Sequence, residues 1–98
     1  MSPYKSKKDR VVVDSILSGF NGVLLKDPGT LSYCIARLIV RYIQSYIDSG
    51  EKVDFSVYNS IIGVLEGNKL ETFKRIVSPY EDKKMEEHGD VYTEIKQD

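Results

Sequence analysis

The sequence has few of the residues that crosslink small proteins or bind metals. Cys34 is the only cysteine, so no disulfide can form within the chain, and one free thiol fits a reducing cytoplasm. His88 is the only histidine, and a zinc site there would need three carboxylate ligands, which is unusual. We therefore expect a cytoplasmic protein without a metal or cofactor.

Long apolar runs and an excess of one charge are also missing. No run reaches the roughly 18 apolar residues that a membrane-spanning helix needs. The 14 Lys and Arg balance 15 Asp and Glu, and the pI is about 5.8, whereas binders of duplex nucleic acid are usually basic. We expect neither a membrane nor duplex nucleic acid as a partner.

Catalytic patterns are missing as well. Cys34 lies in a largely apolar segment without a neighbouring histidine, which indicates a structural thiol. The paired acids at 81–82 and 86–87 lie in a charged run without an apolar pocket to raise their pKa values. There is no glycine-rich loop of the phosphate-binding type. The sequence predicts that the protein is not an enzyme.

The first third of the chain predicts an arm and a short helix. Residues 1–8 are polar and basic and are read as a flexible arm, followed by a single helical domain over 9–98. Asp9 is the expected N-cap of a helix over residues 10–18, although three consecutive valines also suit a strand. The apolar residues 23–25 are expected to pack on the core.

Two long helices are predicted in the middle of the chain. The first has Thr30 as its N-cap and ends at Gly50. Its apolar residues recur every three or four positions: Leu31, Ile35, Leu38, Ile39, Tyr42, Ile43, Tyr46 and Ile47. The second follows Asp54 and runs over 55–77, where Pro79 should stop or bend it.

The fold class that follows is a small all-α domain. It has two long antiparallel helices, a short N-terminal helix, and a short C-terminal helix over about 80–87 that Gly89 closes. The alternating residues 91–95 predict an extended tail. The expected core consists of Leu38, Ile39, Ile62, Leu65 and Phe73.

A polar block around the proline is the candidate ligand-binding site. Arg75, Tyr80, Lys83 and Lys84 combine a guanidinium fork, an aromatic ring and ammonium groups, which suits an anionic aromatic ligand such as a nucleotide. The alternative is a solvated helix in which nearby acids pair with these cations: Glu81, Asp82, Glu86 and Glu87.

A candidate interface lies on the two long helices. Tyrosine is enriched at protein interfaces, and the chain has seven Tyr but no Trp. Tyr42 and Tyr46, with Ile43 and Ile47, widen one helix face beyond what two helices need, which predicts at least a dimer. Gly63 and Gly67 permit close approach of a second helix or a ligand, although ordinary packing within the chain, or a kink at Gly67 and Asn68, is the favoured explanation.

Residues 62–92 resemble the end of a family of short, uncharacterised proteins of phages and prophage-bearing bacteria. The matching motifs are IGVLE at 62–66, KLE at 69–71, Arg75, PYEDKK at 79–84 and GDVY at 89–92. The likeness covers about a third of the chain tightly and residues 31–38 loosely. Family members carry Cys-Ala where this chain has Gly67 and Asn68, which weakens any role for Gly67.

The resemblance implies a surface that recognises a partner, and it favours the binding interpretation of the polar block. We expect a phage-type accessory protein in the host cytoplasm that acts in counter-defence by binding. It would sequester an anionic nucleotide signal or block a host defence protein, as a homo-oligomer. The alternative is a structural or assembly protein of a phage particle that acts through self-association.

Overall fold

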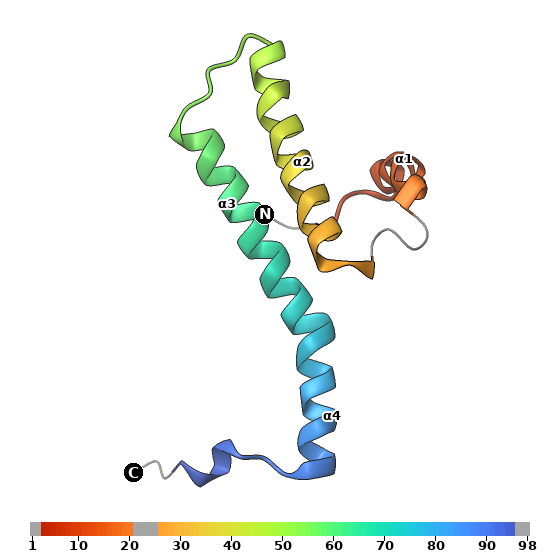
Figure 1. The fold of residues 1–98 in the computed structure, drawn as a ribbon, viewed down its shortest axis with the longest axis vertical. Coiled ribbons are helices and arrows are strands. Elements are labelled where there is room, and N and C mark those ends of the chain that lie inside the picture. The colour runs from red at the N-terminus through yellow and green to blue at the C-terminus, as the bar shows by residue number, and fades with distance from the viewer. Residues whose placement is uncertain (1–2, 21–25, 96–98) are drawn as a thin grey trace. The chain divides into compact units, whose positions relative to one another are not determined.

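The computed structural model describes residues 3–20 and 26–95, and over these ranges it contains helices and turns but no strand (Figure 1). The helical elements, in chain order, are α1 (Lys7–Leu17), η1 (Ser18–Phe20), α2 (Pro28–Asp48), α3 (Phe55–Thr72), η3 (Phe73–Val77), α4 (Ser78–His88) and η4 (Tyr92–Glu94). The all-α prediction is confirmed. The predicted apolar link at 23–25 lies outside the described residues.

The chain divides into two compact units. The first, Met1–Val64, holds α1, α2 and the first half of α3; the second, Leu65–Asp98, holds the rest of α3 and all later elements. The prediction of one helical domain over 9–98 after an arm at 1–8 stays a prediction.

The N-caps of α1 and α2 differ from the predicted residues. Ser6 caps α1, because its hydroxyl accepts a hydrogen bond from the Asp9 N–H at 3.3 Å, so Asp9 is a residue of the first turn. Asp27 caps α2 by accepting from the Gly29 N–H at 3.1 Å. Pro28 then occupies the first helical position, where its missing N–H and preset φ suit a helix start. Thr30 instead donates its hydroxyl to Asp27 at 3.3 Å.

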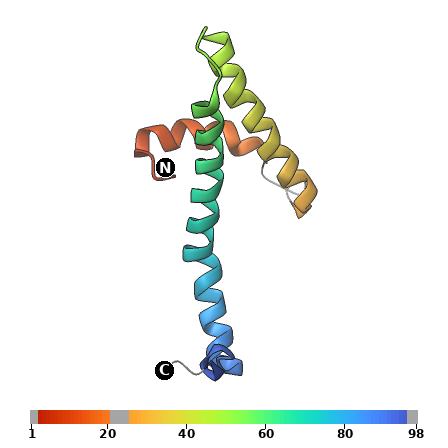
Figure 2. The ribbon, with the colours of Figure 1, turned by 90° about the vertical axis from the view of Figure 1, so that its left-hand side faces the viewer.

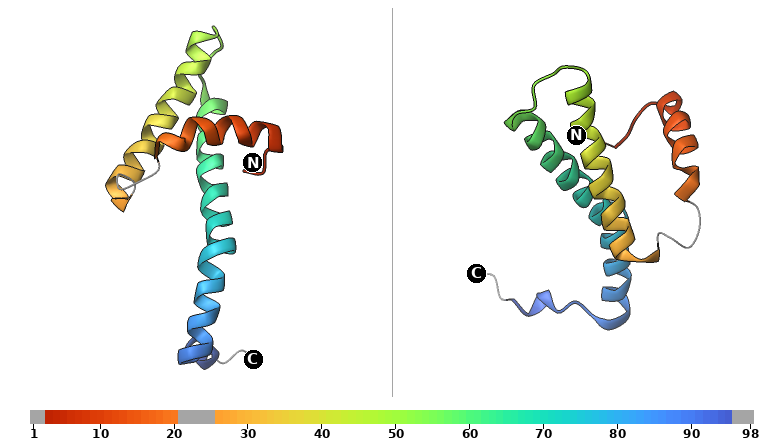
Figure 3. Two further views of the ribbon diagram at one scale, coloured as in Figure 1. Left: turned by 90° about the vertical axis from the view of Figure 1, so that its right-hand side faces the viewer. Right: turned by 45° about the horizontal axis from the view of Figure 1, so that its top comes forward.

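The connection 49–54 between α2 and α3 is built as predicted (Figure 3). Gly50 has φ +76°, and the N–H groups of Gly50 and Glu51 return to the carbonyls of Ile47 and Tyr46, which is a Schellman motif. Asp54 then caps α3, because its carboxylate accepts the N–H and the hydroxyl of Ser56, both at 3.0 Å. The Schellman motif therefore ends α2, and the Asp54 cap begins α3.

The buried surface is much smaller than predicted. Among the described residues Val57 is the one buried apolar side chain, with 4% of its surface exposed. Near the turn, Ile39, Ile43 and Tyr46 are half-buried at helical spacing on α2, Val53 is half-buried in the connection, and Ile61 is half-buried on α3.

The predicted core is therefore wrong in four of its five residues. Leu38, Ile62, Leu65 and Phe73 are exposed, and Ile39 is half-buried. The apolar stripe of each long helix is wide, so periodicity identified the stripe without showing which part of it is covered.

The C-terminal tail is a short turn of helix and not the extended segment that alternation predicted. Asp90 accepts the Tyr92 N–H at 2.8 Å through its carboxylate and the Thr93 hydroxyl at 2.9 Å through its carbonyl. These local bonds close the η4 turn, which ends with the Ile95 N–H on the Tyr92 carbonyl. Alternation over five residues is a weaker signal than a capping aspartate.

Candidate functional site

The polar block lies on an unbroken helical run from residue 65 to residue 88, in the second unit (Figure 2). Arg75 belongs to η3, one turn of π-helix, and Tyr80, Lys83 and Lys84 belong to α4. The helix was predicted to stop or bend at Pro79. It does not stop there, because Ser78 keeps helical angles of φ −61° and ψ −47°.

The π-turn explains how the helix accommodates Pro79. In an α-helix the proline ring would clash with the carbonyl four residues earlier, which is that of Arg75. Here the Ser78 N–H bonds the Phe73 carbonyl five residues back, so the turn before the proline is wider. Pro79 thereby occupies the first turn of α4, where it is tolerated.

This continuity keeps the predicted site residues in a row. Arg75 and Lys83 are eight residues apart, so they lie about 12 Å apart along the helix axis at 1.5 Å per residue. No fold-back at Ser78 brings them together. The four residues therefore line a helix surface, where all are exposed.

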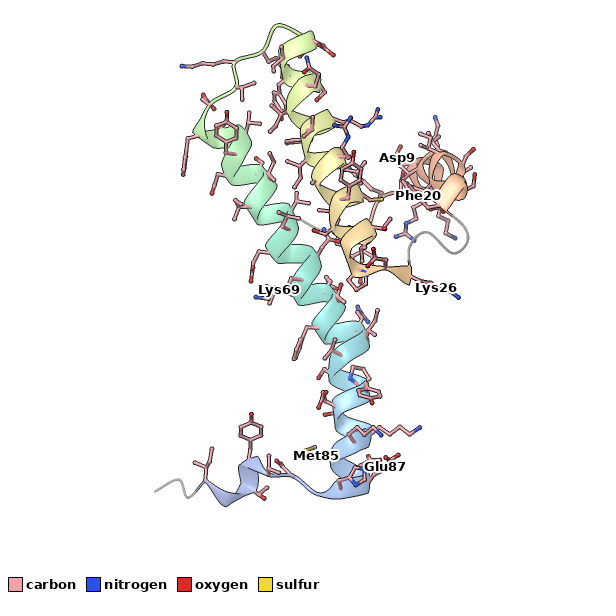
Figure 4. The ribbon with its side chains drawn as sticks, in the orientation of Figure 1. Asp9, Phe20, Lys26, Lys69, Met85 and Glu87 are labelled. Atoms are coloured by element: carbon pink, nitrogen blue, oxygen red, sulfur yellow. The ribbon has the colours of Figure 1, made fainter. Side chains whose placement is uncertain are left out.

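Tyr80, Lys84 and Glu87 make a local cluster on α4. The Lys84 ammonium lies 5.6 Å from the centre of the Tyr80 ring and 3.6 Å from a Glu87 carboxylate oxygen. The His88 imidazole is 3.7 Å from the same oxygen and pairs with it when protonated. Glu87, labelled in Figure 4, thus neutralises one of the predicted ligand-binding cations.

The other cations of the block differ in their partners. Arg75 pairs with Glu71 one turn earlier at 3.6 Å, a partner that the sequence interpretation missed. Within the described ranges Lys83 has no ion pair. Exposed pairs of this kind contribute about 0–1 kcal/mol each, so another carboxylate can replace Glu71 or Glu87 with little loss.

Apolar side chains accompany these cations. Ile76 and Tyr80, one turn apart, have 66% and 57% of their surface exposed, and Phe73 is exposed as well. Sequence reasoning placed Phe73 in the core and gave Ile76 no role. The spacing of Ile76, Tyr80 and Lys84, four residues each, could have shown that they follow one another along the helix.

Nearly the whole chain, residues 2–91, matches a family model described as a domain of unknown function. The chain belongs to the DUF6899 family. The matched residues include α1 to α4 and all four residues of the polar block, so the family domain carries the candidate site. Neither the curated proteins nor the solved structures contain a match to the chain. The occurrence in phages stays a prediction.

The predicted interface residues of the family domain fall into two groups. Ile43, Tyr46 and Gly63 are half-buried, whereas Tyr42 and Ile47 are exposed. The Tyr42 and Tyr46 hydroxyls are 3.2 Å apart, with the rings edge to face at 5.3 Å between their centres. The pKa of Tyr46 is raised, first by its hydrogen bond with Tyr42 and second by electrostatic repulsion from Tyr42.

Cys34 is a half-buried free thiol on α2. No helix in the described part of the chain is long and apolar enough to cross a bilayer.

Proposed function

We propose that this protein is a small non-enzymatic accessory protein that acts by binding another protein through the helical surface 73–84. The observation that carries this proposal is the exposure of Ile76 and Tyr80 beside the cations Arg75, Lys83 and Lys84. Exposed apolar side chains that adjoin one another and are rimmed by polar residues mark protein interaction sites.

The pattern suits a partner with an apolar groove and an acidic rim. Helices that dock into grooves insert apolar anchors one turn apart, and charged residues at the rim set orientation. Residues 73–84 contain four cations and two acids, Glu81 and Asp82, so the local charge is positive. The ion pairs of Arg75 and Lys84 are long, at 3.6 Å, and both cations are about half exposed or more, so a partner's carboxylates can replace Glu71 and Glu87.

A protein partner is favoured over a sequestered nucleotide. Enclosing a nucleotide requires the guanidinium, the ring and the ammonium groups to converge on one small ligand. The row along the helix spreads them over two turns instead, which matches the length of a protein groove. Sequestration would require a further chain to complete the pocket.

The likeness of residues 62–92 to phage and prophage proteins supports the biological setting. We infer that the chain works in the host cytoplasm, where it blocks a host defence protein one to one. We also infer that α2 and α3 pack as antiparallel neighbours, because the connection 49–54 is short. The alternative is an assembly protein of a phage particle, which would act through self-association.

Native mass spectrometry of the full chain purified from the bacteria that express it tests the proposal. We expect a complex with one bound protein per chain. The double substitution Ile76→Ala and Tyr80→Ala should abolish the complex while helicity is retained, because both side chains are exposed. Met85→Ala is the matched control, since Met85 is also exposed on α4 but lies away from the Ile76–Tyr80 line, and it should keep the partner. A partner retained by the double variant, or a bound nucleotide in place of a protein, would contradict the proposal.

A further inference from the structure

The first half of α3 has the composition of a buried helix. Residues 55–65 (FSVYNSIIGVL) contain no charged side chain, in a chain of which 30% is charged. Charged residues are depleted in the centres of protein interfaces and are abundant on free surfaces. An eleven-residue helical stretch without charge is therefore expected to be covered on several sides.

The structure covers this helix on one side only. Val57 is buried and Ile61 is half-buried, one turn apart. Phe55, Tyr58 and Ile62, at spacings of three and four residues, lie on another side, where Phe55 and Ile62 have 79% and 63% of their surface exposed. These three residues, here called the α3 stripe, are an apolar seam of which half or more of each residue's surface is exposed.

A second seam lies on α2. Leu31, Ile35, Leu38 and Tyr42, here called the α2 stripe, recur at spacings of four, three and four residues and are all exposed. That 3-4 spacing is typical of helices that pack side by side in bundles. Leu38 and Tyr42 each precede a half-buried residue, Ile39 and Ile43, so the exposed and covered sides of α2 are roughly a quarter turn apart at 100° per residue.

Two apolar sides about a quarter turn apart are what a helix in a four-helix bundle presents to its two neighbours. Among its described residues, the first unit supplies two long helical segments, α2 and the first half of α3. We propose that a second copy of this chain supplies the other two, with the α2 stripe of each copy packed on the α3 stripe of the other. Such a contact is reciprocal, so it closes as a two-fold dimer and leaves no unpaired stripe.

The exposed area and the charge both fit a second copy as the occupant. The seven side chains are on average about half exposed, and with about 200 Å² on a side chain of this size they leave roughly 700 Å² per copy. One partner in a standard stable interface contributes about 800 Å². The net charge of −1 gives little repulsion between copies. This dimer uses none of the residues of the 73–84 surface, so it stands independently of the proposed function.

Sedimentation equilibrium of the full chain at micromolar concentrations tests the dimer. We expect twice the chain mass of 11.2 kDa for the wild type. Leu38→Lys and Ile62→Lys, one in each stripe, should each shift the mass to that of one chain. Val40→Lys, an exposed α2 position outside the stripe, is the matched control and should remain dimeric. A wild-type mass of 11.2 kDa, or dimers of both stripe variants, would overturn the proposal.

A crosslinking measurement keeps the proposal testable if the lysine variants unfold. In a Cys34→Ser background, Leu38→Cys and Ile62→Cys are combined in one chain, and isotopically labelled and unlabelled chains are mixed before oxidation. Mass spectrometry of the digested product should show position 38 joined to position 62 between labelled and unlabelled copies. Linkage confined to single copies, or linkage only between identical positions, would contradict the reciprocal arrangement.

Discussion

Residues 55–65 of α3 and the eleven residues of α4 (Ser78–His88) are helices of equal length with opposite chemistry. The α3 segment has no charge and contains the buried Val57. In α4 six of the eleven residues are Asp, Glu or Lys, and none of its side chains is buried. The α3 segment is stabilised by burying apolar surface against other helices. The stability of α4 depends instead on Pro79 in its first turn, Gly89 at its C-terminal end, and ion pairs between neighbouring side chains.

The difference indicates that α3 contributes mainly to packing, whereas α4 keeps its side chains exposed. Helices of about a dozen residues are marginal in water unless they bury an apolar face. The α3 segment meets that requirement through burial, in its own chain and in the proposed dimer. In α4 the apolar Tyr80 remains exposed, which leaves it available to a partner.

The largest predicted effect is the loss of stability when the buried valine of α3 is shortened. Val57→Ala should lower the free energy of unfolding by about 2 kcal/mol, because it removes buried methyl groups and leaves a cavity. The matched change Val40→Ala, at an exposed position of α2, should stay within about 0.5 kcal/mol. Denaturant melts followed by circular dichroism give both values. Equal losses at the two positions would mean that Val57 is not the centre of the core.

Two glycines with positive φ, one after α2 and one after α4, allow the stability of the two regions to be compared. Gly50 and Gly89 have φ +76° and φ +88°, and an added Cβ would meet no atom within 4 Å at either position. Alanine therefore adds only backbone strain, about 1 kcal/mol. Gly50→Ala should lower the stability of the main unfolding transition, since Gly50 joins the two long helices. Gly89→Ala should fray the end of α4 and leave that transition unchanged. A shift of the main transition by both variants would show that α4 unfolds together with α2 and α3.

Removing the charge of Lys84 should have a smaller effect. Lys84→Met deletes the pair with Glu87 and the contact with the Tyr80 ring, and it keeps most of the aliphatic length. Because these groups are about half exposed, the change in stability should be about 0.5 kcal/mol or less. Comparing the melts at low and high salt checks this, since the difference in stability between wild type and variant should shrink as salt screens the Lys84–Glu87 pair.

The smallest effect concerns the tyrosine pair of α2. The folded-state pKa of Tyr46 is raised by Tyr42, so the pair stabilises the fold below the ordinary tyrosine pKa of 10.0, and this contribution is lost as the pH rises through the folded-state pKa. Tyr42→Phe removes the cause, and the phenolate absorbance of Tyr46 should then appear at lower pH. An unchanged titration would show that the two hydroxyls do not interact in solution.

Helix ends were predictable from sequence where one residue decides the backbone. Asp54, Gly50 and Gly89 act as expected, because a capping carboxylate or a positive φ leaves few alternatives. Predictions were wrong where two residues compete, as with Ser6 and Asp9, or Asp27 and Thr30. Pro79 was misread because a π-turn accommodates it, and a π-turn has no simple sequence signal.

The site and the core were harder to predict for a physical reason. The four candidate ligand residues were identified by type, but their arrangement depends on whether the helix continues past Ser78. The core residues depend on which part of a wide apolar stripe is covered, and that is decided by the neighbouring helix. This chain of 98 residues leaves apolar stripes exposed on α2 and α3. In our proposal, the helices that cover these stripes belong to a second copy of the chain.

Hydrogen–deuterium exchange of the wild-type chain tests the contrast between the two helices most directly. We predict slow exchange at residues 39–47 and 57–65, with protection that increases with protein concentration because the proposed dimer covers these helices. We predict fast exchange in α4 at every concentration, because we expect α4 to open locally. Protection of α4 equal to that of residues 57–65, or exchange at 57–65 as fast as in α4, would contradict this contrast between the two helices.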